Sequence, residues 1–359
     1  MKKRHNVLKK LLISTFLVLA TTPASAQLIP DNTLGQEAST VNNSTLIKGG
    51  NADLVNGGAQ RGSNLFHSFT EFSINNGQRV YFANPSGVQN ILTRVTGGNA
   101  SNILGTLGVD GAANLFIINP NGILFGQNAS LDIQGSFVGT TANAVKFGNQ
   151  GIFSATNPET APLLTIQPSA LLFNQINQQA SITNQSQAPA GIKPVGENVT
   201  GLRVPDGKSL LLVGGNVNID GSAVRAYGGN IELAGLAAPG NIELNIAGDN
   251  LALVMPDVNR ANVLLSNGAE LNVRGSNGGN INIYARNLDA TGESKIRAGI
   301  DKGLGTPSSQ GGNIVVNATG TISLSNNSLI SNTLRADAFG QSGNVNISTG
   351  SLNLKNNSY

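Results

Sequence analysis

A short unit recurs in the second half of the chain and limits the folds open to it. Each copy is a small residue, a Gly and an Asn, followed by residues that alternate between apolar and polar. The copies lie at residues 214–219, 228–233, 278–283, 311–316 and 342–347. The last three asparagines are 33 and 31 residues apart, and the 50 residues from Asn230 to Asn280 fit two coils of about 25 residues. Periods of this size predict a solenoid.

The residues that follow each copy indicate which solenoid. A second short alternating segment comes next, as at residues 271–273 and 322–324. We therefore predict an all-β chain forming a right-handed parallel β-helix, in which coils of two or three short strands stack about 4.8 Å apart. Equivalent asparagines are expected to stack as amide ladders. At about 25 residues per coil, the exported chain would form about 13 coils.

The composition is consistent with a thin, stacked core. Gly accounts for 45 of 359 residues, aromatic residues for 4% and charged residues for 11%. Such a chain cannot wrap one thick globular core, yet it is too apolar to be disordered. There is no cysteine. Either the chain must stay uncrosslinked while it crosses a further barrier, or a long solenoid needs no disulfide.

Residues 1–26 have the pattern of a secretory signal peptide. A cationic segment precedes an apolar run at residues 11–20, and small residues lead to a predicted cleavage between Ala26 and Gln27. A membrane anchor is the alternative, but it needs about 20 apolar residues and Pro23 ends this run early. Removing the peptide leaves 17 Lys and Arg against 19 Asp and Glu, a net charge of −2. Without a basic patch interleaved with aromatic residues, nucleic acid is excluded as a partner.

The strongest local signal is a tight turn near residue 120. The apolar runs at residues 114–118 and 123–125 are too short for helices and flank Asn119-Pro120-Asn121-Gly122. Pro120 fixes φ at the second turn position, and Gly122 suits the exit. The segment is predicted to form a strand, a turn and a second strand.

Several segments around this turn occur in a familiar order and spacing. They are NLFHSFTEF at residues 64–72, NILTRVTGG at 90–98, SNILGTL at 101–107 and FVGTTAN at 137–143. Together with the turn, they resemble the N-terminal haemagglutination-activity domain of filamentous-haemagglutinin-like exoproteins. These are the secreted partners of two-partner secretion systems.

This resemblance implies a route and a partner. In the family, periplasmic domains of an outer-membrane β-barrel transporter recognise the N-terminal domain, and the remainder crosses the pore and folds outside. Two Asn-Pro motifs are associated with this role. Residues 119–122 match the second in full, whereas Asn84-Pro85-Ser86-Gly87 half matches the first, where many members have Asn-Pro-Asn-Leu. These residues either contact the transporter or maintain the fold. The chain is expected in the medium or at the surface of a Gram-negative cell.

The expected organisation has three parts after the signal peptide. Residues 27–155 form the secretion domain and the start of the β-helix, and residues 27–64 contribute to an N-terminal β cap, because an open strand edge would pair with other chains. Phe66, Phe69 and Phe72, with Ile74, are expected to form a bulky internal layer; a helical stripe is the alternative. Residues 156–209, with six prolines, form a looser transition within the solenoid. Residues 210–359 form the repeats and stop mid-repeat, as a fragment would.

An enzyme is the main alternative function, since parallel β-helices also host polysaccharide lyases and hydrolases. Those enzymes need carboxylates gathered on neighbouring coils for acid–base work or for Ca²⁺. The aspartates of the repeat region are scattered, at Asp220, Asp249, Asp257, Asp289, Asp301 and Asp337. His67 and Arg94 are expected to be structural. We predict no catalytic residue, metal or cofactor.

The predicted activity is therefore that of an adhesin or surface structural protein with a carbohydrate or protein receptor. A cytolysin or toxin carrier would depend on further C-terminal sequence. Carboxylates clustered in a groove would favour the enzyme, and a featureless ladder surface would favour adhesion.

Overall fold

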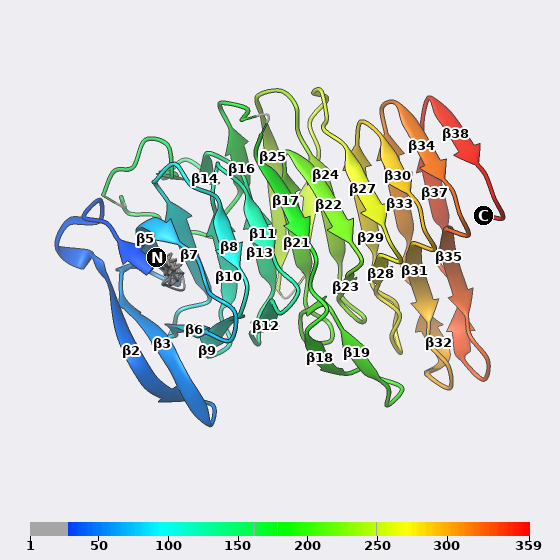
Figure 1. The fold of residues 1–359 in the computed structure, drawn as a ribbon, viewed down its shortest axis with the longest axis horizontal. Helices are drawn as coiled ribbons and strands as arrows, with labels where there is room; N and C mark the ends of the chain where they lie inside the picture. Colours follow the sequence, from blue (N-terminus) through cyan, green and yellow to red (C-terminus); the bar gives the residue numbers. More distant parts are fainter. Residues whose placement is uncertain (1–27, 161, 178, 249) are drawn as a thin grey trace, which may run out of the picture.

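The computed structural model describes residues 28–359 except 161, 178 and 249. The predicted signal peptide and its cleavage site at Ala26 and Gln27 lie outside the described residues. The described chain is a parallel β-helix whose strands stack from the blue N-terminal end to the red C-terminal end (Figure 1). The described part contains one 3₁₀ helix, η1 (Gly35–Glu37), and no α-helix. Within it, no helix has the length and apolarity needed to cross a membrane.

Three faces of stacked parallel strands form the β-helix. Face 1 consists of β5 (Asn64–Phe72), β7 (Asn90–Val95), β10 (Asn114–Ile118), β13 (Phe137–Thr140), β21 (Leu210–Gly214), β24 (Ile231–Gly235), β29 (Ile281–Ala285), β33 (Ile314–Ala318) and β37 (Val345–Ser348). Face 2 consists of β8 (Ser101–Ile103), β11 (Ile123–Phe125), β17 (Ser181–Asn184), β22 (Asn216–Asp220), β27 (Val263–Ser266), β30 (Leu288–Ala290), β34 (Thr321–Leu324) and β38 (Ser351–Leu354). Face 3 has two stacks. The first is β3 (Gly50–Gly57), β6 (Arg79–Ala83), β9 (Thr106–Asp110) and β12 (Ser130–Asp132); the second is β20 (Leu202–Arg203), β23 (Ala223–Arg225), β28 (Glu270–Asn272), β31 (Lys295–Ile300) and β35 (Leu329–Leu334).

Apolar side chains that point inward from the three faces form one continuous core along the rod. On face 1, Leu65 pairs with Ile91, and Ile91 pairs with Leu115. All three are buried in the same cluster, which extends to Leu324. Inward residues recur at equivalent positions because the side chains of a strand alternate with period two.

The predicted asparagine ladder is present on face 1. Asn90 donates from Nδ2 to Asn64 Oδ1 at 2.9 Å, and Asn114 donates to Asn90 Oδ1 at 3.0 Å. Further along, Asn280 donates from Nδ2 to Asn230 Oδ1 at 3.1 Å. The repeat copies are not all equivalent, however. Asn216 begins β22 on face 2, so the first copy belongs to a different ladder.

The expectation of two coils between Asn230 and Asn280 is wrong. Strand β24 pairs directly with β29, so these 50 residues form one coil. The extra length is a hairpin of β25 (Gly240–Ala247) and β26 (Asn250–Val254). In the described residues, face 1 has nine parallel strands rather than 13 coils, because insertions of this kind take up chain length.

The insertions build an antiparallel layer against the outer side of face 1. It contains β14 (Ala144–Phe147), β15 (Gly151–Ser154), β16 (Ala170–Phe173), β25 and β26. Phe66 lies in the core beneath this layer, 5.5 Å from the ring of Phe147 and 4.8 Å from that of Phe153. Phe69, Phe72 and Ile74 lie in the interior core. The expectation of one internal layer is therefore wrong for Phe66, because Phe66 and Phe69 are three apart on a regular strand and point to opposite sides. A register irregularity after Phe69 returns Phe72 to the interior.

Antiparallel pairs occur at the N-terminal end. β1 (Leu28–Pro30) and β4 (Ala59–Arg61) each pair with β5, and β2 (Ser39–Ile47) forms a hairpin with β3. Segment 64–72 is a strand, so the helical alternative is wrong. The remaining strands form two small pairs, β18 (Pro189–Ile192) with β19 (Asn198–Thr200) and β32 (Gly305–Gln310) with β36 (Phe339–Gln341).

Candidate secretion-signal site

The turn at residues 119–122 connects face 1 to face 2, between β10 and β11. Gly122 donates its N–H to the Asn119 carbonyl at 3.1 Å and closes the turn. Asn121 donates its N–H to Asn119 Oδ1 at 2.9 Å. The φ of Gly122 is +116°, which L side chains rarely adopt. The predicted strand, turn and strand are confirmed.

The two asparagine side chains of this turn bind the preceding coil. Asn119 is fully buried, and its Nδ2 donates to the Asn99 carbonyl and to Ser101 Oγ, both at 3.0 Å. Asn121 Nδ2 donates to the Gly97 carbonyl at 2.8 Å. Both amides are therefore engaged within the β-helix, where each holds the loop that joins β7 to β8.

The Asn84 turn connects face 3 to face 1, between β6 and β7, and binds in the opposite direction. Asn84 Oδ1 accepts the N–H of Ala113, in the following coil, at 2.9 Å. Its Nδ2 donates to the Val88 carbonyl at 3.1 Å. The tip of the turn, Pro85 to Gly87, is exposed. The Asn84 turn precedes a strand of face 1, and the Asn119 turn follows one. The two motifs therefore lie at opposite ends of the face 1 strands.

Arg94 is a buried junction between three parts of the molecule. It donates from Nε to Ser68 Oγ at 2.9 Å, from Nη1 to the Ser154 carbonyl at 3.0 Å and from Nη2 to Thr33 Oγ1 at 2.7 Å. Burial lowers its pKa to about 10, although Asp31 opposes the shift. Arg94 thus joins the N-terminal segment, face 1 and the antiparallel layer, as expected of a structural residue.

His67 is buried, and its contacts do not indicate a catalytic role. Its Nδ1 lies 3.0 Å from Ser39 Oγ. Burial lowers its pKa to about 3, so the imidazole is neutral at physiological pH and a weak base.

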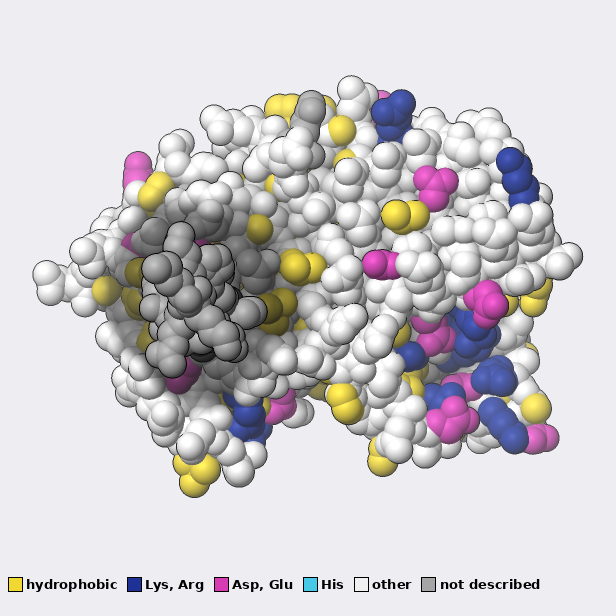
Figure 2. Space-filling view, in the orientation of Figure 1, with side chains coloured by type: hydrophobic (Ala, Val, Ile, Leu, Met, Phe, Trp, Pro, Cys, Tyr) yellow, Lys and Arg dark blue, Asp and Glu magenta, His cyan; other side chains and the backbone are white. Residues whose placement is uncertain are grey.

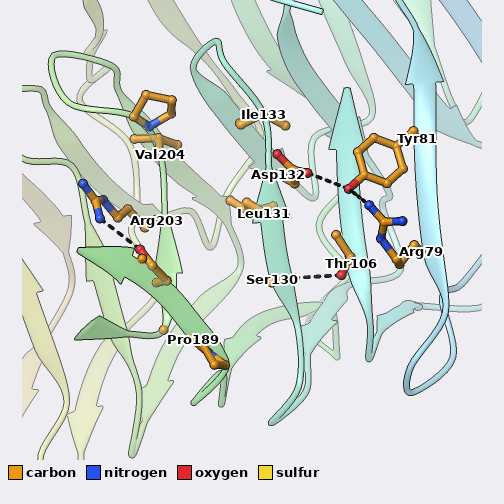
Figure 3. A pocket seen from close by; sticks show the side chains of 14 residues that line it. Arg79, Tyr81, Thr106, Ser130, Leu131, Asp132, Ile133, Pro189, Arg203 and Val204 are labelled. Carbon is orange, nitrogen blue, oxygen red and sulfur yellow. Dashed lines mark hydrogen bonds between the residues drawn. The ribbon is translucent and has the colours of Figure 1, made fainter. Parts of the chain in front are cut away.

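A cavity of about 420 Å³ lies where the two stacks of face 3 meet (Figure 3). On one wall, Arg79 donates to the Tyr81 hydroxyl at 2.8 Å, and Tyr81 donates to Asp132 Oδ2 at 2.6 Å. Burial and the Asp132 carboxylate raise the pKa of Tyr81 to about 12. On the other wall, Arg203 donates to the Ala190 carbonyl at 3.0 Å. These polar groups are bound to one another, and Asp132 is the one carboxylate among the lining residues.

Comparisons with known proteins agree with this architecture. Residues 26–283 match the family model of the TPS secretion domain. The chain belongs to this family. A solved filamentous hemagglutinin secretion domain superposes with a TM-score of 0.51 at 18% identity, covering 91% of this chain and 99% of that one. The HMW1 secretion domain from Haemophilus influenzae gives a TM-score of 0.45 at 17% identity, covering 89% of this chain and 96% of that one.

A curated relative matches a shorter stretch of this chain. The heme/hemopexin-binding protein of Haemophilus influenzae is 35% identical over 80 residues, which is 22% of this chain and 8% of that protein. The match therefore spans a small part of that relative. Membership of the family implies export by a Gram-negative two-partner system with a partner transporter in the outer membrane. The predicted resemblance is confirmed.

The chain also carries a charged cleft of about 300 Å³ that the sequence did not reveal. We name it the arginine cleft, and its charged lining residues are Lys193, Glu197, Arg225, Glu270, Arg274, Arg297, Asp301 and Arg335. They come from several coils, so only stacking brings them together. Of the scattered aspartates, Asp301 alone enters this lining. No group of three His, Cys, Asp or Glu in the described part of the chain could hold a metal ion.

Proposed function

We propose that this chain is an exoprotein carried by a partner outer-membrane β-barrel transporter, whose periplasmic domains recognise its TPS secretion domain. The observation that carries the proposal is the family match over residues 26–283. The signal-peptide pattern of residues 1–26 would deliver the chain to the periplasm, where such recognition takes place. The product would be secreted or held at the cell surface.

We further propose different roles for the two Asn-Pro turns. Asn119 is buried and Asn121 donates to the preceding coil, which supports an indirect role through the fold. Pro85, at an exposed tip, is available for direct contact with the transporter. Asn84 would hold that tip in place through its bond to Ala113.

The fold suggests how export could proceed in one direction. Coils of a solenoid are stabilised mainly by their neighbours, so they can be added one at a time as the chain emerges. Residues 28–64 would serve as the N-terminal cap, since β1 covers the edge of β5 that would otherwise be open. Folding outside the cell would then oppose return through the pore.

For the exported product we propose adhesion or a structural role at the surface, without catalysis. The arginine cleft does gather three carboxylates, which is the observation that favours the alternative of a carbohydrate-active enzyme. Each of them is ion-paired, however, and although burial raises the pKa of Glu270, Arg225 and Arg297 bring it below its usual value. Glu270, which is held ionised, cannot supply the proton that glycoside hydrolysis requires. Release of shortened products from an acidic polysaccharide would contradict this proposal.

The test is release into the medium from a Gram-negative host with and without the cognate transporter. Release only with the transporter is expected. Equal release in both hosts, or periplasmic retention in both, would contradict the two-partner assignment.

Variants then separate folding from recognition. Asn119→Ala should reduce release and lower the thermal unfolding midpoint, whereas Pro85→Ala should reduce release with the midpoint unchanged. Asn76→Ala is the matched control, because Asn76 lies at an exposed turn and its side chain contacts Asn128 at the surface. Normal release of the Pro85→Ala variant would show that Pro85 is not part of the surface that the transporter recognises.

A further inference from the structure

On the face of the molecule seen in Figure 2, the largest group of charged side chains lies in one place. Only 11% of the residues are charged. Figure 2 shows dark-blue and magenta side chains gathered at the lower right, over the part of face 3 formed by β28, β31 and β35, while most of the visible surface is white. This group includes the arginine cleft.

The stacking of face 3 places the basic side chains in register. Arg225 pairs with Asn272, and Asn272 pairs with Arg297, so these three occupy one row across β23, β28 and β31. Neighbouring strands are about 4.8 Å apart, which sets the spacing of the row. Arg274 lies just beyond β28, and Lys193, in the loop between β18 and β19, also lines the cleft.

The acidic residues of the cleft are already neutralised by this row and its neighbours. Glu270 lies 2.8 Å from Arg225 and 3.0 Å from Arg297. Asp301 lies 3.4 Å from Arg335 and 3.8 Å from Lys193. With Glu197 on Lys193, five cationic residues face three carboxylates, so the lining carries a net charge of +2.

Arg274 is the cationic residue of the cleft that takes part in none of these ion pairs. It is 6% exposed, and its Nη2 donates to the hydroxyls of Ser331 and Thr333, both at 3.2 Å. Among the described residues, no carboxylate lies within ion-pair distance of it. Burial and the nearby Arg297 and Arg335 lower its pKa to about 10, against the opposing effect of Asp301 and Glu270, and it stays charged at neutral pH. A buried charge without a counterion is costly, so an anion entering this cleft would be bound favourably.

The lining also indicates the chemical class of that anion. A guanidinium presents a planar fork that matches the two oxygens of a carboxylate or sulfate. Asn198 and Thr200 add an amide and a hydroxyl suited to sugar hydroxyls. The lining contains no aromatic residue on which a nucleobase could stack. Outside a cell, acidic polysaccharides carry such oxyanions.

We propose that the arginine cleft binds an acidic sugar through its carboxylate or sulfate group, with Arg274 as the principal contact and Arg335 beside it. This proposal specifies a ligand for the proposed adhesive role. It rests on that role in one respect, namely that the exported chain meets the sugar outside the cell. Binding is measured on the purified chain and release in cells, so a failure of either proposal can be told from a failure of the other.

The test is calorimetric titration of the purified full chain with oligogalacturonate, its methyl ester and an oligosaccharide of carrageenan, which carries sulfate and no carboxylate. At least one of the two acidic probes should bind, and the neutral ester should bind at least about tenfold more weakly. Whichever acidic probe binds more tightly identifies carboxylate or sulfate as the natural group. Equal binding of ester and acid, or no binding of either acidic probe, would overturn the proposal.

Substitutions locate the binding. Arg274→Gln should weaken it at least about tenfold, because a charge-assisted hydrogen bond is lost. Arg286→Gln removes the same charge at an exposed position outside the cleft and should leave the affinity unchanged. Since Arg274 is buried, Arg335→Gln is the second variant; its side chain is 44% exposed, so the fold should persist while binding weakens. Wild-type affinity in a folded Arg274→Gln or in Arg335→Gln would place the anion elsewhere.

Discussion

Face 1 has a covered half and a bare half, and their strands differ in the same way as their surroundings. In the covered half, β10, β13, β21 and β24 lie between the interior core and the antiparallel layer and are buried at nearly every position. In the bare half, β29 and β33 alternate between buried and partly exposed residues. One outward row makes the change visible, since it runs Phe66, Leu92, Phe116, Val138, Leu211, Glu232, Asn282 and Val315.

The comparison shows that the sequence of a coil records what covers it. Residues 115–118 and 210–213 are continuous apolar runs, as expected for parallel strands buried on both sides. Residues 281–284 alternate, as expected for strands with one wet side. The β-helix is thus one architecture with two kinds of wall.

The largest effect should come from removing an aromatic ring from the core beneath the antiparallel layer of the covered half. Phe116 is fully buried beneath the antiparallel layer, so Phe116→Ala should lower the free energy of unfolding by about 3–5 kcal/mol. Val315→Ala, in the same row of the bare half, should cost less than about 1 kcal/mol, because its side chain is partly exposed. Thermal and denaturant unfolding of both variants measures the difference. Similar losses would mean that the antiparallel layer does not bury the row in solution.

Glu232, at the boundary of the two halves, should make stability depend on pH. It is fully buried and accepts a hydrogen bond from Asn282 at 2.7 Å, and burial raises its pKa to about 8. Between its ordinary pKa of 4.5 and about 8, the unfolded chain ionises while the folded chain keeps the proton. Stability should therefore fall as pH rises through this window, by up to about 4 kcal/mol.

The control for this prediction is the neutral isostere. Glu232→Gln should abolish the decline between these pH values and be more stable than the wild type at pH 8. A wild-type profile that is flat over this window would show that Glu232 is ionised in the folded chain.

His67, in the covered half, should act in the opposite direction. Its pKa falls from 6.5 to about 3 on burial, so below pH 6.5 the unfolded chain binds a proton that the folded chain does not bind. Stability should then fall as pH drops from 6.5 towards 3, by an amount no larger than about 4 kcal/mol. Thermal unfolding at successive pH values, compared with His67→Gln, measures this contribution. Parallel profiles for the two proteins would count against it.

The sequence predicted the elements that depend on local patterns. The turn at Asn119, the two strands that flank it and the Gly-Asn ladder follow from residue types and from their spacing along the chain. The antiparallel layer could not be predicted, because nothing in the segment 240–254 indicates that it leaves the coil and pairs with β16. Counting coils failed for the same reason.

The arginine cleft could not be predicted because its residues meet only through stacking. Arg225, Arg274 and Arg297 are 49 and 23 residues apart in the sequence. The hairpin of β18 and β19 lies within residues 156–209, which the sequence indicated only as a looser transition. With the coil register known, the row Arg225, Asn272 and Arg297 would have been visible. The insertion before Asn280 concealed that register.

The smallest effects should come from the asparagine ladder, which crosses both halves. Asn90 is fully buried, donates to Asn64 and Gln167, and accepts from Asn114. Asn90→Ala should cost about 1–3 kcal/mol, because buried partners lose their hydrogen bonds.

Asn313, on an exposed rung of the same ladder, accepts one backbone N–H, from Asn344 at 2.8 Å. Water can replace that bond, so Asn313→Ala should cost no more than about 0.5–1 kcal/mol. Unfolding of the two variants against the wild type gives both values. If Asn313→Ala were as costly as Asn90→Ala, the ladder would contribute through its stacking along the axis rather than through burial, and the two halves of face 1 would be equivalent in this respect.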